Sequence, residues 1–152
     1  MPTILVKIPK GSFPGDSRTT LAKKITEAAS TVEQMPADPR KQFVTWVLID
    51  EVESGGLTCG GADVTAQFLP CVAVVYVPSG VLDEASRRQC VQLMHAAFGE
   101  AMPVGEKRQL ATSIILHDVP DGTWGASGAL WKLPDFVKAS GYAHLQHLVQ
   151  AA

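Results

Sequence analysis

The chain has 152 residues, enough for one domain whose core needs no metal ion or disulfide. Its formal net charge of −2 gives no reason to expect nucleic acid or an anionic membrane as a partner. Hydrophobic residues make up 46% of the chain and charged residues 18%, which suggests that apolar surface is buried between subunits. The sequence has no run of the roughly 20 apolar residues that span a membrane.

The first part of the chain is predicted to form a strand, a helix and a second strand. Residues 2–10 are β-branched and aliphatic, and the strand stops at Pro9 and Gly11. A helix capped by Asp16 or Ser17 is expected to run to about residue 32, where apolar side chains at helical spacing give it one buried face. The second strand covers residues 43–52 and leads through a glycine-rich turn to Gly61.

The same pattern then repeats in the second half of the chain. A strand at 71–78 ends on Val77-Pro78-Ser79-Gly80, which echoes Ile8-Pro9-Lys10-Gly11. A helix over 83–101 closes on Met-Pro, as the first helix does, and the strand 114–119 is followed by the glycine-rich stretch 122–128. The repeat therefore predicts two β-α-β units in tandem.

Two such units predict an α+β two-layer sandwich, with a four-stranded mixed sheet and both helices on one face. The other face carries apolar residues that nothing in the chain except the tail is large enough to cover, so self-association through this face is expected. The organisation expected is a single domain, 1–152, with a first unit at 1–61, a linker at 62–70, a second unit at 71–128 and a helical tail at 129–152. In the tail, a helix from Leu133 is expected to be interrupted at Gly141.

The residue after the initiator is the main catalytic candidate. If Met1 is removed, Pro2 carries a free secondary amine at the mouth of a strand. An α-amino group has a pKa of about 8, and an apolar setting lowers it. A neutral prolyl nitrogen is a suitable general base for a proton next to a carbonyl group. Cys71 occupies the equivalent position in the second unit, so one site per chain is expected.

Pro2 at the start of a strand, the tandem repeat and the hairpin Val119-Pro120-Asp121-Gly122-Thr123-Trp124-Gly125-Ala126-Ser127-Gly128 together resemble the tautomerase superfamily. The hairpin is similar to that of 4-oxalocrotonate tautomerase (4-OT). The doubled length is similar to the cis-3-chloroacrylic acid dehalogenases and the malonate semialdehyde decarboxylases. The resemblance covers about residues 2–128 and implies a homotrimer that works without a cofactor or metal.

The chain departs from the family where the family binds carboxylates. One arginine of the short tautomerases matches Ser12 in the first unit and Val81 in the second. A second arginine of that family matches Trp46 and Ser113. The dehalogenase histidine, tyrosine and glutamate align with Ala29, Ile115 and Ala126, which makes that mechanism unexpected here.

The residues proposed to contact substrate are therefore a mixed set. Trp124 is either a cavity wall or core, and His117 is either a ligand contact or a sheet-end histidine. The best-placed cations precede the two second strands. The full set of substrate-contact candidates is Trp124, His117, Ser113, Arg40, Lys107 and Arg108.

The function expected is that of a tautomerase-type isomerase, in which Pro2 moves a proton on a small carbonyl or enol substrate. The alternatives are a decarboxylase or hydratase of the same superfamily, or a catalytically silent trimeric binding protein. Three cysteines without CxxC spacing are typical of reduced thiols and predict a cytoplasmic location.

Overall fold

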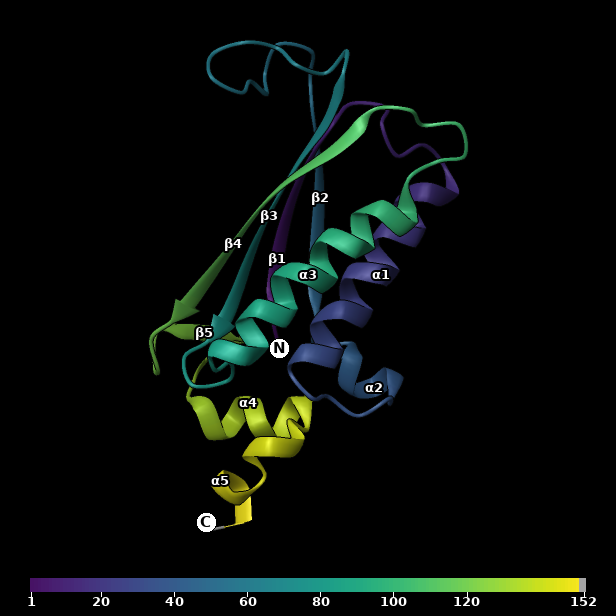
Figure 1. Cartoon of the computed structure of the whole chain (residues 1–152). Helices are drawn as coiled ribbons and strands as arrows, with labels where there is room; N and C mark the ends of the chain where they lie inside the picture. The colour runs from purple at the N-terminus through teal and green to yellow at the C-terminus, as the bar shows by residue number, and fades with distance from the viewer. Residues whose placement is uncertain (151–152) are drawn as a thin grey trace.

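A computed structural model describes residues 1–150 of the chain (Figure 1). The last two residues of the predicted tail, 151–152, lie outside the described residues. The elements, in chain order, are β1 (Thr3–Pro9), α1 (Asp16–Val32), α2 (Pro39–Gln42), β2 (Trp46–Val52), β3 (Phe68–Pro78), α3 (Glu84–Ala101), β4 (Gln109–Val119), β5 (Trp124–Ala126), β6 (Ala129–Trp131), α4 (Leu133–Ser140), the 3₁₀ turn η1 (Ala143–Leu145) and α5 (His147–Gln150).

The four long strands form one mixed sheet in the order β2-β1-β3-β4. Within each half the two strands are parallel, and β1 and β3 join the halves as an antiparallel pair. Figure 1 shows α1 and α3 side by side on one face of this sheet, and they pack against each other. The predicted α+β sandwich of two β-α-β units is therefore confirmed.

The helix-covered face of the sheet holds the core. Ile4, Val6 and Ile8 alternate along β1 and are fully buried, and alternate residues of β3 join them. β5 and β6 form a second, two-stranded sheet that is not hydrogen-bonded to the main one. Among residues 1–150, no helix is long and apolar enough to cross a membrane.

The opposite face of the sheet is uncovered, as the sequence predicts. Its central row crosses all four strands and is aliphatic throughout, because the register aligns Leu48, Leu5, Val74 and Ile115. Leu48 is 45% and Ile115 49% exposed. One neighbouring row contains the Lys7–Asp50 ion pair within the chain.

The helix starts differ in detail from the prediction. The N-cap of α1 is Gly15, at a φ of +53° that favours glycine, and neither Asp16 nor Ser17 caps the helix with its side chain. In α3, Asp83 is the N-cap and exchanges hydrogen bonds with Ser86, each of 2.8 Å, in a capping box. The second strands also differ, since β2 begins at Trp46 and β4 already at Gln109.

In Figure 1 the first tail helix, α4, lies across the lower end of the sheet and the long helices, and α5 follows further from the sheet. Helix α4 ends at Gly141, which has a left-handed φ of +73° and donates its N–H to Val137 at 2.8 Å. Phe136, Val137 and Tyr142 from the tail are fully or nearly fully buried. The predicted break at Gly141 is thus present, and it turns Tyr142 into the core.

Candidate functional site

The amino-terminal end of β1 borders a cavity of about 440 Å³. The lining is mostly aromatic and aliphatic and includes all three tryptophans of the chain. It consists of Met1, Thr3, Phe43, Val44, Trp46, Trp124, Gly125, Ala126, Ser127 and Trp131. Within the described part of the chain, this lining contains no lysine, arginine or acidic side chain.

The β5-β6 hairpin forms one wall of this cavity. Ser127 and Gly128 both have positive φ, as a two-residue turn of this hand requires, and the turn places Trp124 opposite Trp131. Both indoles rest on Phe136 of α4, with ring centroids 5.4 and 5.2 Å away. The tail helix therefore supports the wall.

The terminal amine of Met1 is buried beside the cavity. Its three N–H groups have three acceptors: Glu33 Oε2 at 3.0 Å, Ser140 Oγ at 3.0 Å and the hydroxyl of Tyr142. All three acceptor residues are buried, and Glu33 is only 2% exposed. Two of these partners come from the tail, more than 130 residues from Met1 in the chain.

The amine and the carboxylate perturb each other in a water-poor setting. Burial lowers the pKa of the Met1 amine from its ordinary value, although the nearby Glu33 opposes this effect. Burial raises the pKa of Glu33, against the opposing attraction of the amine and a smaller one from His144. The two proton affinities are thereby brought closer together than those of the same groups in water.

Pro2 lies next to this pair but is not an amine in the structure described. Met1 precedes it, so the Pro2 nitrogen is part of a peptide bond and cannot accept a proton. Pro2 is buried, and its carbonyl accepts a hydrogen bond from Trp46 N at 3.0 Å. A role for Pro2 as a base therefore requires removal of Met1, as the sequence argument assumes.

Two of the residues proposed from the sequence to contact substrate lie on the uncovered face of the sheet, not in the cavity. His117 packs against Tyr76 with a ring-centroid distance of 5.1 Å, and Ser113 is exposed two rows away. Arg40 is near the cavity mouth, where it forms a shallow depression with Phe43. Its guanidinium, however, is paired with Asp38 at 3.0 Å. Within one chain, only Trp124 of the predicted substrate contacts lines the cavity.

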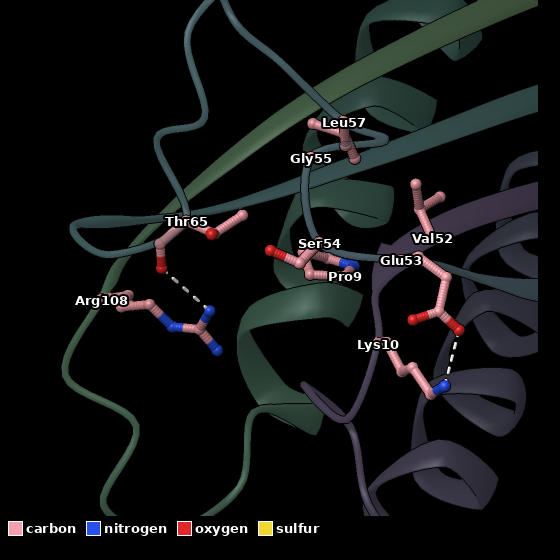
Figure 2. Close-up of a pocket in the computed structure, with 9 residues that line it drawn as sticks. All are labelled: Pro9, Lys10, Val52, Glu53, Ser54, Gly55, Leu57, Thr65 and Arg108. Carbon is pink, nitrogen blue, oxygen red and sulfur yellow. Dashed lines mark hydrogen bonds and ion pairs between the residues drawn. The ribbon is translucent and has the colours of Figure 1, made fainter.

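The remaining predicted cations lie at the opposite end of the sheet, where a second cavity of about 280 Å³ is found (Figure 2). Arg108 lines this cavity, but Glu106 at 2.6 Å and the carbonyl of Thr65 at 3.2 Å engage its guanidinium. Figure 2 also shows Lys10 turned toward Glu53, with which it pairs at 2.6 Å. The length of β1 puts about 20 Å between this cavity and Met1. Lys107, the neighbour of Arg108 in sequence, is exposed.

The structure adds residues that the sequence analysis missed. Glu33 had a detectable signal, because it continues the row Leu21, Ile25, Ala29 at intervals of four, where the next residue should be apolar. An acid at that position of a buried helix face needs a partner. Ser140 and Tyr142 carried no comparable signal, since only folding brings the tail to the terminus.

No family model matches the chain, and no curated protein matches it. Solved structures do. A native fused 4-OT matches with a TM-score of 0.68 at 19% identity, covering 84% of this chain and 94% of that one. A fused 4-OT wild type asymmetric trimer gives 0.68 at 16%, covering 84% and 94%.

FG41 malonate semialdehyde decarboxylase inhibited by 3-bromopropiolate matches with a TM-score of 0.63 at 11% identity, covering 84% of this chain and 91% of that one. At such identities the likeness concerns the fold alone. It agrees with the resemblance that Pro2, the repeat and the hairpin carry in the sequence. The chain therefore has the fold of the tautomerase superfamily, in its fused, double-length form.

Proposed function

We propose that the chain is a tautomerase-type isomerase that uses the amine of Pro2, after removal of Met1, as general acid and base. The observation that carries the proposal is the position of the amino terminus, which is buried beside an aromatic-lined cavity and does not extend into solvent. Terminal residues are usually exposed and mobile unless something holds them. The enzyme would need no cofactor and would act in the cytoplasm.

Removal of Met1 would open the cavity onto Pro2, because Met1 is itself part of the lining. The new terminus would be a secondary amine in apolar surroundings, where burial favours its neutral form. Its nitrogen would take a proton from the carbon next to a carbonyl, as the electron pair moves to oxygen and gives an enolate, which becomes the enol when the same proton is passed to that oxygen. Returning the proton at another carbon completes a keto–enol or double-bond isomerisation.

Trp124 would form the substrate wall in this mechanism, together with Trp46 and Trp131. His117 and Ser113 would reach a substrate only across the uncovered sheet face, and so only in an assembled oligomer. For Arg40, Lys107 and Arg108 the existing carboxylate partners or the distance from Met1 favour a structural role.

A homotrimer is the assembly we propose, because the uncovered face exposes an aliphatic row across the whole sheet. The trimeric form of a fused 4-OT with the same fold supports this number of subunits.

The test compares wild type with Pro2→Ala, in protein whose mass shows that Met1 is absent. Ketonisation of phenylenolpyruvate and of 2-hydroxymuconate should fall by roughly 10²–10⁴-fold in the variant, the usual contribution of a positioned general base. Pro134→Ala, an exposed proline at the start of α4, serves as the matched control and should keep the full rate. Equal rates in wild type and Pro2→Ala, both above the uncatalysed rate, would end the proposal.

A decarboxylase or hydratase of the same fold would use the same amine. Product analysis with malonate semialdehyde and with propiolate distinguishes these reactions from isomerisation.

A catalytically silent trimeric binding protein is the second candidate function, and one observation favours it. The Met1 amine has three buried acceptors, as expected of a terminus that stays in place. Native protein that retains Met1 by mass spectrometry and ketonises neither substrate would support this candidate over the isomerase.

A further inference from the structure

The acceptors around the Met1 amine make up a complete receptor for a primary ammonium group. An ammonium has three N–H donors, and Glu33, Ser140 and Tyr142 supply one acceptor each. A prolyl terminus, by contrast, has at most two N–H donors. The receptor therefore matches a primary ammonium better than it matches the Pro2 amine itself.

Nothing in the fold alone accounts for a carboxylate at this place. Glu33 is the C-cap of α1, where the helix dipole disfavours a negative charge, and its side chain is 3% exposed. Burying an acid there is costly unless a cation is held close to it. In the structure that cation is the amine of Met1, which leaves the site if Met1 is removed.

The cavity next to the receptor is suited to a positively charged ligand. Trp46, Trp124 and Trp131 line it, and the faces of indole rings attract ammonium groups. Its described lining contains no lysine or arginine, so a dicarboxylate would find no counter-ion there.

We infer that the substrate of the Pro2-terminated enzyme carries a primary ammonium, which Glu33, Ser140 and Tyr142 hold while the tryptophans enclose its apolar body. This inference rests on the function proposed above and names its substrate class. It also gives a physical reason for the missing family arginines, since the site binds a cation in place of a carboxylate.

The geometry of the backbone around Pro2 narrows the substrate class further. Adjacent backbone nitrogens lie no more than about 4 Å apart, so an ammonium at the Met1 position would be about that far from Pro2 N. Glu33 Oε2, 3.0 Å from the Met1 amine, would be at most about 7 Å from Pro2 N. A carbon that lies against Pro2 N while the ammonium is held about 4 Å away is then the carbon bearing the ammonium or the carbon bonded to it. The substrate is an α- or β-amino carbonyl compound or its enol.

The binding test uses L-methioninamide, which has the ammonium and side chain of the missing Met1. Calorimetry on protein lacking Met1 by mass should detect binding, and N-acetyl-L-methioninamide should bind at least tenfold more weakly because it lacks the charge. Glu33→Gln and Tyr142→Phe should each weaken L-methioninamide binding, the former at least tenfold. The control Glu27→Gln, an exposed acid of the same helix, should leave it unchanged.

Equal affinity for the two methionine derivatives, or unchanged affinity in Glu33→Gln, would overturn the inference. So would native protein that retains Met1, because its amine would fill the receptor.

A second measurement separates this inference from the proposed function. Deuterium exchange of the methylene protons of aminoacetone, followed by NMR, is compared with that of hydroxyacetone, its uncharged counterpart. Relative to the uncatalysed rates, wild type should favour aminoacetone at least tenfold, and Glu33→Gln should lose that preference. Pro2→Ala should lose catalysis of both exchanges but still bind L-methioninamide. Catalysis retained in Pro2→Ala would sink the proposed function, whereas catalysis without preference for the amine would sink only the substrate class.

Discussion

Phe136 supports the cavity wall, and its removal should be costly. Phe136 is 2% exposed and contacts Trp124 and Trp131. Replacing a buried phenylalanine by alanine costs about 3–5 kcal/mol, which for a chain of this size lowers the Tm by about 6–20 °C. We therefore expect Phe136→Ala to lose stability and to loosen both hairpin tryptophans.

The assay is urea unfolding followed by far-UV circular dichroism, with tryptophan emission of the folded protein as the local measurement. Val104→Ala, at a fully exposed loop position, is the control and should change stability by less than about 0.5 kcal/mol. If Phe136→Ala does not fold, Phe136→Leu should still lose measurable stability and shift the emission to longer wavelength. A Phe136→Ala variant within 1 kcal/mol of the control, with unchanged emission, would refute the role of the tail as a support for the wall.

Three further outcomes follow from the structure. Ile115→Lys places a charge in the aliphatic row, so light scattering should report single chains where the wild type gives trimers; trimers in the variant would contradict the proposed interface. Arg108 lowers the pKa of Glu106 to about 2, from 4.5 in the unfolded chain. The resulting stability is present above pH 4.5 and is lost as the pH falls toward 2, so wild type should lose Tm relative to Glu106→Gln in that window, whereas parallel curves would argue against the pairing. Burial raises the pKa of Cys71 to about 12 and that of Cys90 to about 11, so iodoacetamide at pH 8 should modify only the exposed Cys59 in the folded chain and all three thiols in urea.

Most of the fold could be predicted from the sequence because the relevant signals are local. Alternation along residues 2–9 and 71–78 identified the central strands, and the repeat determined that each half pairs its own strands in parallel. The uncovered sheet face followed from the same alternation. The errors were local too: Gly15, not Asp16 or Ser17, is the N-cap of α1, because the backbone there needs a positive φ.

The candidate site could be predicted only in part. Trp124 was predicted from its hairpin and lines the cavity, whereas the role of Pro2, predicted from its place in the chain, stays a prediction. The cations proposed for substrate were chosen by sequence position, but Asp38 and Glu106 neutralise Arg40 and Arg108 in the structure. Local sequence does not reveal such partners, because charge pairs depend on side-chain distances in the folded state.

The sequence by itself thus determined the strand and helix pattern, the tandem arrangement and the exposed apolar face. Only the tertiary structure decided that Glu33, Ser140 and Tyr142 meet at the amino terminus, since contacts over more than 100 residues leave no periodic trace in the sequence. Burial then determines their chemistry, because an acid or an amine that is buried without an oppositely charged partner is strongly destabilised. This cost makes the site specific.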